Sequence, residues 1–160
     1  MITIGFFSGT SLFAQGIKLL TNSPVSHSAI GFCKDNKWYW LHAVGSGVQI
    51  VDRGWEGNLY AEFQVLPDVQ NEVEIAERKV GEPYSKLTIL GFVIMIIAKW
   101  FGIGIHNPFY QKSAVVCSEL VVEADIYHLI HEFDGLDPAD ISPGVLFNIC
   151  SNGTSFKKLT

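Results

Sequence analysis

The chain has 160 residues, 48% of them hydrophobic and 17% charged, so it is long enough to bury a core and too apolar for a disordered protein. Sixteen acids against eleven bases give a net charge of -5, and no long basic stretch occurs, which excludes nucleic acid as the expected main partner. The cysteines are too few for a disulfide framework and indicate a reducing compartment. The opening MITIGFFSGTSLF has no basic region before its apolar residues, so we expect a cytoplasmic protein without a signal peptide.

The first part of the chain is predicted to form strands around one helix. Strand-like patterns of apolar, β-branched and aromatic residues occupy 2–7, 26–32, 38–44, 48–51 and 60–66. Apolar residues at helical spacing predict a helix from Ser11 to Leu20, with a Ser or Thr cap. The turn-forming residues between the second and third strands predict an antiparallel hairpin.

The second part of the chain is predicted to be mainly helical. We expect one helix over 71–80 and a longer one from Ser113 or Ala114 to Glu132. Residues 134–144, DGLDPADISPG, read as a loop, and 156–159 as a last edge strand. No repeat or linker interrupts the chain, so residues 1–160 are predicted to form one α+β domain.

A cysteine stands where an apolar stretch becomes an amphipathic helix, at Cys117 in VVCSELV. The N–H groups and dipole at a helix N-terminus favour a thiolate, which predicts a lowered pKa for this thiol. A cysteine hydrolase also needs an imidazole to hold the proton and a polar group to orient that imidazole. His27 in SHSAIGF and His42 in WYWLHAV each interrupt an apolar strand, where an unpaired imidazole would cost about 1–3 kcal/mol. Together these residues favour a catalytic site.

The order of SHSAI, WLHAVGSGVQIV and VVCSELV resembles the circularly permuted papain-like hydrolases of the NlpC superfamily, in which the cysteine helix follows the histidine strand. The stretch GEPY at 81–84 is similar to the GxPY stretch of that superfamily. PADISPGVL is similar to the segment after the cysteine helix in bacterial permuted members. The resemblance covers about residues 2–148, nearly the whole chain.

The resemblance implies a papain-like antiparallel sheet packed against helices, with the nucleophile at the start of a long helix. It implies Cys117 as nucleophile, His27 as general base, His42 as the orienting residue and Tyr84 as a substrate-binding residue beside the nucleophile. The backbone N–H of Cys117 would help to hold the oxyanion. No metal or organic cofactor is implied.

Two positions depart from the family pattern. Ser85 and Lys86 stand where a glycine pair commonly follows the tyrosine, and His42 stands where bacterial permuted members frequently have an acid. A histidine there also resembles the lecithin–retinol acyltransferase branch, which acts on lipid acyl chains. We therefore expect hydrolysis of an amide in a peptide or a peptidoglycan-type stem through an acyl-enzyme. A lipid ester hydrolase or acyltransferase is the first alternative, and a non-catalytic binding module is the second.

The remaining thiols have simpler interpretations. Cys33 lies in a predicted turn and Cys150 near the C-terminal loop, so both are expected to be structural. A zinc site made of His27, Cys33 and His42 would match no standard finger spacing. We therefore expect no metal among these residues.

Other polar residues of the second part are also given structural roles. His128 and His131 are three apart on a predicted helix, and without an HExxH pattern a solvated face is favoured over a metal site. Glu119, in the first turn of the Cys117 helix, is expected to favour the helix dipole or to make a structural contact.

The apolar segment from Leu87 to Ile105, LTILGFVIMIIAKWFGIGI, has Lys99 as its single charge. Its length just reaches the transmembrane range. Because it lies between His42 and Cys117, which we place in one site, we expect a buried helix. A lipid-facing or interfacial surface, with contact to a membrane surface, is the alternative.

The hairpin register decides whether the two strand histidines share a face, because side chains alternate along a strand. Pairing Lys37 with Phe32 or with Lys34 places both rings on one face. Pairing Lys37 with Cys33 places them on opposite faces. A catalytic pair needs one of the first two registers, which we predict, with both rings facing the start of the Cys117 helix.

Overall fold

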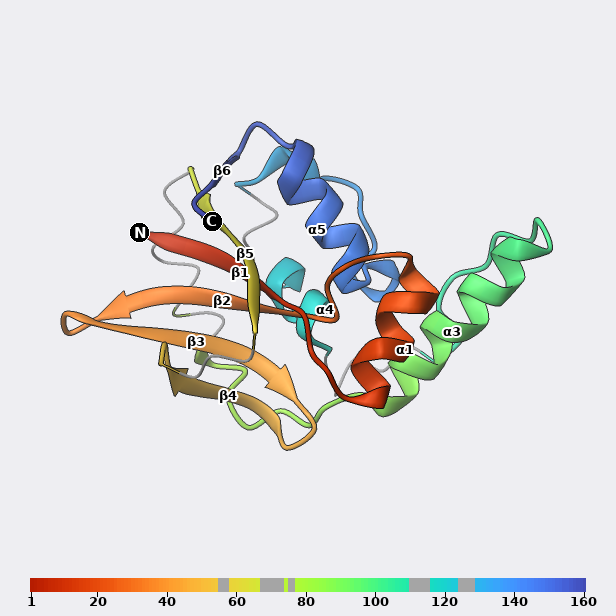
Figure 1. Ribbon diagram of the computed structural model, residues 1–160, viewed down its shortest axis with the longest axis horizontal. Helices are drawn as coiled ribbons and strands as arrows, with labels where there is room; N and C mark the ends of the chain where they lie inside the picture. Colours follow the sequence, from red (N-terminus) through yellow and green to blue (C-terminus); the bar gives the residue numbers. More distant parts are fainter. Residues whose placement is uncertain (55–57, 67–73, 75–76, 110–115, 124–128) are drawn as a thin grey trace.

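The computed structural model describes residues 1–54, 58–66, 74, 77–109, 116–123 and 129–160. Its strands form a six-stranded antiparallel sheet in the order β4-β3-β2-β1-β5-β6 (Figure 1). The strands are β1 (Ile2–Phe7), β2 (His27–Lys34), β3 (Lys37–Val44), β4 (Gly47–Asp52), β5 (Leu59–Val65) and β6 (Phe156–Lys158). The predicted strands, the last edge strand included, are thus confirmed.

Most of the helices lie between β5 and β6 along the chain, and one further helix lies between β1 and β2. They are α1 (Leu12–Thr21), α3 (Lys86–Trp100), α4 (Cys117–Glu123) and α5 (Pro143–Asn152), with short 3-10 helices η2 (His131–Phe133) and η3 (Pro138–Asp140). The helix α4 packs on β2 and β3, and α5 contacts α4 and β6. The helix α1 lies beside α3, which extends away from the sheet (Figure 1). The predicted α+β class is confirmed.

The main core lies between the sheet and the helices α4 and α5. Strand residues such as Ile4, Phe6 and Ile30 meet Leu120 and Val121 of α4, all fully buried. These strand positions alternate with residues of the other face, which are also buried in the central strands. The alternation fixes which residues can approach α4.

The hairpin of β2 and β3 has the register that pairs Lys34 with Lys37. Asp35 and Asn36 form the two-residue turn, with φ of 52° and 61°. A type I′ turn needs positive φ at both positions, and asparagine and aspartate tolerate it better than most residues. This register is one of the two that we predicted, and it puts both strand histidines on one face, as their ring contact shows. The prediction of a shared face is confirmed.

The face of the sheet opposite the main core carries a smaller cluster around Trp40. Its ring fills the space over Gly5 and Gly31, where an added Cβ would come within 2.7 Å and 2.6 Å of the indole. Phe7 meets the indole edge-on at 5.4 Å, and Ala29 completes the cluster. Glycine is therefore required at Gly5 by the neighbouring indole, and at Gly31 by the Thr3 hydroxyl together with the indole.

Two helix predictions need correction. The cysteine helix begins at Cys117, since Val116 is not helical, and it does not extend to Glu132, which lies in η2 after the non-helical Ile130. Residues 143–152, which begin inside the predicted loop, form α5, which starts with a Ser142 side-chain cap and a proline in its first turn. Half of the predicted helix over 71–80 lies outside the described residues; of the rest, residues 74 and 77 are helical and 78–80 form a turn.

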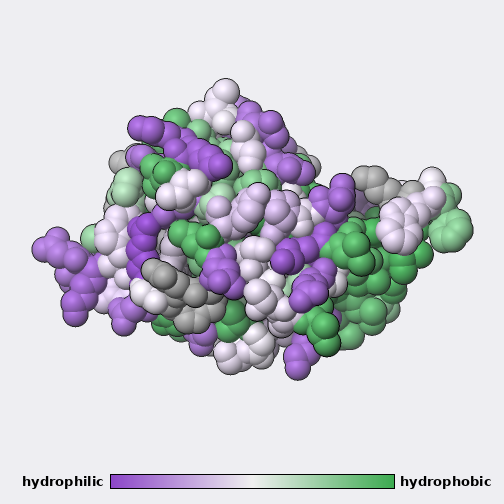
Figure 2. Space-filling view, in the orientation of Figure 1, coloured by the Kyte–Doolittle hydropathy of each residue, from purple (hydrophilic) through white to green (hydrophobic). Residues whose placement is uncertain are grey.

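The prediction of a buried helix within Leu87 to Ile105 is wrong. The helix α3 ends at Trp100, and most of its described apolar side chains are partly or largely exposed, whereas Phe92 and Thr88 are buried. Figure 2 shows hydrophobic residues gathered over this end of the molecule. Among the described residues, no helix is both long and apolar enough to cross a membrane.

Candidate functional site

A chain of hydrogen bonds joins the two strand histidines to β4. His27 Nε2 lies 3.2 Å from His42 Nδ1, and His42 Nε2 lies 3.2 Å from Gln49 Nε2. The Ser46 hydroxyl donates to Gln49 Oε1 at 3.4 Å, which orients the amide so that its NH₂ faces the ring. Gln49 therefore donates to His42, the proton of neutral His42 is on Nδ1, and His27 accepts it at Nε2. In this arrangement neutral His27 has its own proton on Nδ1.

Loss of hydration keeps both imidazoles uncharged at neutral pH: His42 is fully buried, and His27 is half-buried at the edge of an open hollow. Desolvation, together with the neighbouring His42, lowers the pKa of His27 to about 3. Desolvation lowers the pKa of His42 to about 4. Because a buried imidazolium would lose its hydration, the neutral pair is the stable form. The imidazolium that a resting ion pair with a thiolate would need is therefore disfavoured.

The nucleophile candidate Cys117 is the first residue of α4, in the position expected for it, and is buried. Desolvation raises the pKa of this thiol. The amides of Cys117, Ser118 and Ser28 and the Ser28 hydroxyl act in the opposite direction, because they favour the thiolate, but they do not outweigh burial. The expected lowering of this pKa is wrong: loss of hydration exceeds the effect of the helix N-terminus.

Ser28 is a site residue that the sequence did not single out. Its side chain is fully buried, and its Oγ has no hydrogen-bond partner among the described residues that meets standard geometry. The hydroxyl and backbone N–H of Ser28 nevertheless face the Cys117 sulfur closely enough to lower its pKa. A buried hydroxyl without another partner can donate to a thiolate or to an oxyanion formed on the thiol's substrate.

The alternation of β2 places the His27 ring and the Ser28 hydroxyl on opposite faces. His27 pairs with Phe7 and lies against its ring, in the cluster with Trp40, whereas Ser28 pairs with Phe6 on the main-core face. The histidines thus come together on the Trp40 face, whereas α4 packs on the opposite face and the thiol approaches the sheet at the residue after His27. The prediction that both rings face the start of the Cys117 helix is therefore wrong, because His27 and Ser28 alternate across the sheet. His27 is the first residue of its strand, so the end of the sheet lies beside it.

Two hollows meet at this end of the sheet. One is a small, mainly apolar cavity of about 30 Å³ beside Cys117, and the other is an open hollow lined in part by His27. Ser26 and Tyr84 line both of them. Ile17 also lines both, so the two hollows adjoin at these residues.

Tyr84 is brought to the thiol by a short backbone pairing. Val48 N donates to Glu82 O at 2.9 Å, and Gly81 N donates to Val48 O at 2.9 Å, which holds the GEPY stretch against β4. Burial and the charge of the Cys117 thiolate raise the pKa of Tyr84, so its hydroxyl stays protonated. The predicted substrate-binding residue thus lines the cavity of the predicted nucleophile.

The cavity beside Cys117 is lined mainly by apolar side chains from two helices. Its walls include Ile17, Leu20, Ile89, Phe92, Val93 and Ile96. Such walls suit a hydrocarbon chain better than a charged or strongly polar group.

Glu119 has the structural contact that we expected. Its Oε2 accepts a hydrogen bond from Val116 N at 3.1 Å, and its side chain is fully buried. Desolvation raises its pKa to about 8, and the nearby carboxylate of Glu123 adds to the rise. Glu119 is therefore largely protonated at neutral pH and supports the segment before Cys117.

The buried position of Cys150 agrees with its expected structural role, whereas Cys33 lies in β2 and not in the predicted turn, and its structural role stays a prediction. Cys150 is buried in the main core, and Cys33 is exposed, paired with Trp38 near the hairpin turn, far along β2 from His27. A zinc site of His27, Cys33 and His42 therefore does not form. Among the described residues, Cys117 likewise forms no compact three-ligand group with the two histidines.

One cluster has the ligand types of a divalent-cation site. Atoms of His106, Asp137 and Asp140 lie within 4.8 Å of one another. Both carboxylates already have local roles: Asp140 binds His106 Nδ1 at 2.7 Å and Asn107 N at 3.0 Å, and Asp137 caps η3. These contacts explain the cluster, so we assign no metal to it. His131 is exposed and contacts Ser155, and His128 lies outside the described residues.

No protein-family model and no curated protein sequence matches this chain. Among solved structures, the chain is similar to the metalloprotein YiiX from Escherichia coli O157:H7, described as DUF1105, with a TM-score of 0.66. The match covers 99% of this chain and 94% of that chain at 18% sequence identity. At this identity the likeness concerns the fold: the chain has the α+β fold of YiiX, with its six-stranded antiparallel sheet and helices.

Proposed function

We propose that this protein is a permuted papain-like cysteine hydrolase that cleaves an ester or thioester of a long acyl chain. The observation that carries the proposal is the apolar cavity that ends at Cys117, between α1 and α3. The mainly apolar character of the helical walls favours an acyl group over the peptide or peptidoglycan stem that the sequence suggested. The fold likeness to YiiX is compatible with this proposal and says nothing about the substrate.

The reaction begins with both groups neutral, because burial raises the pKa of Cys117 and lowers that of His27. As the sulfur attacks the acyl carbonyl, its proton passes to His27, and the C–S bond forms. The imidazolium then protonates the leaving alcohol or thiol as its bond to the acyl carbon breaks. Water, deprotonated by His27, attacks the acyl-cysteine and releases the acid and the free thiol.

Proton transfer requires His27 Nδ1 to meet the sulfur around the end of the sheet, past Ser26 and Tyr84. It also requires Nδ1 to be an acceptor. That state has the proton of His27 on Nε2, donated to His42 Nδ1, with the proton of His42 on Nε2 and the Gln49 amide turned to accept it. Rotating one amide therefore reverses the direction of the whole hydrogen-bond chain.

The oxyanion formed on the carbonyl would be held at the start of α4. The N–H groups of Cys117 and Ser118 and the Ser28 hydroxyl face the sulfur. Donors placed in this way stabilise a tetrahedral intermediate. Tyr84, protonated in its buried position, would line the same pocket and contact the acyl group.

The proposal is tested by intact-mass spectrometry of the protein with p-nitrophenyl esters and acyl thioesters of increasing chain length. We expect an acyl adduct on Cys117, faster for long than for short chains, and no adduct with Cys117→Ala. The same panel should include a peptide amide. Acylation of Cys117 by the amide alone would support the amidase that the sequence predicted. No adduct with any substrate would support a binding module.

A further inference from the structure

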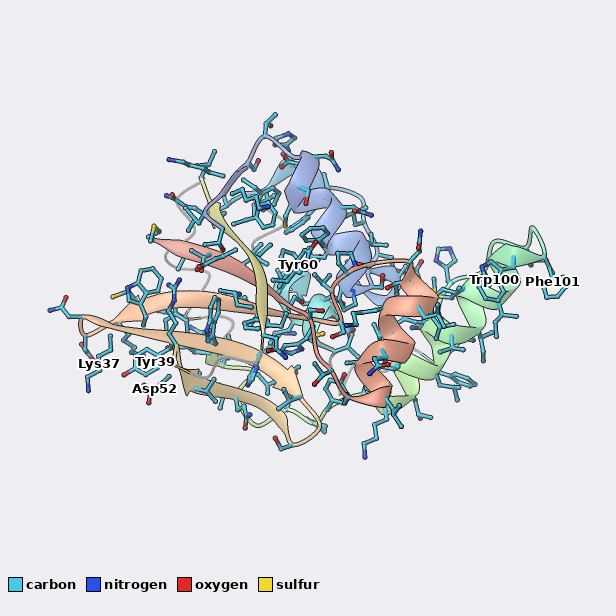
Figure 3. All side chains as sticks on the ribbon, in the orientation of Figure 1. Lys37, Tyr39, Asp52, Tyr60, Trp100 and Phe101 are labelled. Carbon is cyan, nitrogen blue, oxygen red and sulfur yellow. The ribbon has the colours of Figure 1, made fainter. Side chains whose placement is uncertain are left out.

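The helices α1 and α3 lie side by side, and each exposes large apolar side chains, which together we call the helix surface. On α1, Leu12 and Leu19 are 88% and 82% exposed. At the end of α3, Trp100 and Phe101 are 72% and 78% exposed, and Figure 3 shows both at the tip farthest from the sheet. Large exposed apolar patches mark sites that bind another protein or a membrane. We propose that the helix surface binds the surface of an anionic lipid bilayer.

The shape of α3 favours a bilayer over a protein groove. Its apolar residues are not confined to one narrow stripe, and Leu87, Leu90, Ile97 and Trp100 are all exposed. A helix that is apolar around most of its circumference needs an apolar medium on more than one side. A projecting helix of this kind can enter the boundary between lipid headgroups and acyl chains, and its tryptophan suits that depth.

The distribution of charge selects anionic lipid. All sixteen acids lie outside residues 1–33 and 83–109, the two stretches that contain α1 and α3. The bases of those stretches are Lys18 in α1 and Lys86 and Lys99 in α3. In a protein with a net charge of -5, the helices α1 and α3 thus carry lysines and no acid, while Asp137 and Asp140 lie against His106 beyond the end of α3. Lys18 Nζ also donates to the Ser8 hydroxyl at 3.1 Å. Each lysine close to an anionic membrane contributes about 1 kcal/mol of attraction.

A hollow leads from the helix surface toward the thiol. It is lined by α1, α3 and α5 and runs from Leu20 and Phe92 to Trp100. It shares Leu20, Phe92 and Ile96 with the cavity beside Cys117, so the two spaces adjoin. Asp140 is the acid among its described lining residues, and it is paired with His106. The surface proposed to meet lipid is therefore the one onto which the apolar space opens.

The test is flotation of the full chain with vesicles of phosphatidylcholine alone and of an equal mixture of phosphatidylcholine and phosphatidylglycerol. We expect binding to the mixed vesicles that weakens as salt is added. Trp100→Ser combined with Phe101→Ser should weaken binding on the order of tenfold or more, because each ring buries a large apolar area. Lys18→Gln and Lys86→Gln should each weaken it about fivefold on mixed vesicles.

The matched control replaces two leucines that are exposed elsewhere, just beyond the ends of β5 and β6. Leu66→Ser combined with Leu159→Ser should leave binding unchanged, and circular dichroism should show all variants folded. Cys117→Ser should also bind, since docking does not depend on the proposed chemistry. Absence of binding to both vesicles, or equal loss in the control, would overturn the proposal. So would a dimer in light scattering that Trp100→Ser and Phe101→Ser dissociate without any vesicle binding, because the surface would then join two copies.

Discussion

His27 Nε2 and His42 Nδ1 lie 3.2 Å apart on neighbouring strands, and both rings are neutral because burial depresses their pKa values to about 3 and about 4. In the unfolded chain each imidazole takes up a proton near its ordinary pKa of 6.5. Below that pH the unfolded state binds more protons than the folded state. The histidine pair therefore makes the stability of the folded protein fall as the pH is lowered.

We expect the free energy of unfolding to fall as pH is lowered from 6.5 toward 4, and to be insensitive to these groups above 6.5. The slope should approach about 1.4 kcal/mol per pH unit for each histidine. Urea unfolding of the wild type and of His27→Gln combined with His42→Gln measures it. The double variant should lose most of the slope; an unchanged slope would show that the rings are not buried as neutral groups.

Alkylation by iodoacetamide at neutral pH should modify Cys33 first. Cys33 is exposed, whereas burial raises the pKa of both Cys117 and Cys150. Peptide mapping after short exposure gives the order. Ser28→Ala should slow the labelling of Cys117 further at alkaline pH, because it removes a donor that favours the thiolate, and should leave Cys33 unaffected. Labelling of Cys117 ahead of Cys33 would instead support the lowered pKa of Cys117 that the sequence predicted.

The two histidines should not be equivalent in turnover. His27→Ala removes the proposed base and should abolish it, while His42→Gln still offers a group that hydrogen-bonds a ring nitrogen and should leave measurable activity. Rates of acyl-ester hydrolysis measure both. If His42→Gln is inactive and His27→Ala is not, the roles are exchanged.

Gln49 offers a sharper test of the hydrogen-bond direction. A carboxylate only accepts, so Gln49→Glu should hold the proton of His42 on Nε2 and leave His27 Nδ1 to act as acceptor. It should also raise the pKa of His42, because the new charge favours the imidazolium. We expect Gln49→Glu to keep or increase turnover and Gln49→Leu to lower it about tenfold or more, as for a lost general-base alignment. NMR titration of the ring protons checks the pKa shift. Loss of activity in both variants alike would indicate a packing role.

Glu119 should make the protein less stable as pH rises from 4.5 to 8. Its pKa is raised in the folded state to about 8, so the folded chain holds a proton that the unfolded chain releases. Stability from this group is present below pH 4.5 and is lost through pH 8. Glu119→Gln should remove that loss and be more stable than the wild type at pH 8, on the order of a few kcal/mol. Asp134→Asn, at an exposed acid, is the control and should follow the wild type.

The sheet and the pairing of the histidines could be predicted because their signals are local. Alternating residues mark β2 and β3, and Asp35 and Asn36 are residues that a two-residue turn accepts. The helix α5 was missed although Ser142 and Pro143 are a recognisable start, since the preceding residues DGLDPADI read as an extended loop.

The state of the site could not be predicted, because it depends on burial. The position of Cys117 at a helix start indicates a low pKa, but only the packing around it shows that desolvation dominates. Ser28 and Gln49 gave no signal of their own, being common polar residues in strands. The exposure of α3 could not be predicted for a related reason. An apolar run indicates that its side chains avoid water, but it does not indicate whether protein or lipid covers them.

Trp40 occupies a space that β1, β2 and β3 share, where Gly5 and Gly31 leave room for its ring. These three positions are distant in sequence but coupled: a methyl group at Gly5 needs a smaller residue at 40, and one at Gly31 would meet the Thr3 hydroxyl as well as the indole. Proteins descended from a common ancestor with this one that keep Trp40 should therefore keep the set of three. Phe7 lies between the indole and the His27 ring, so lineages that replace the set are also those in which the histidine pair is free to be lost.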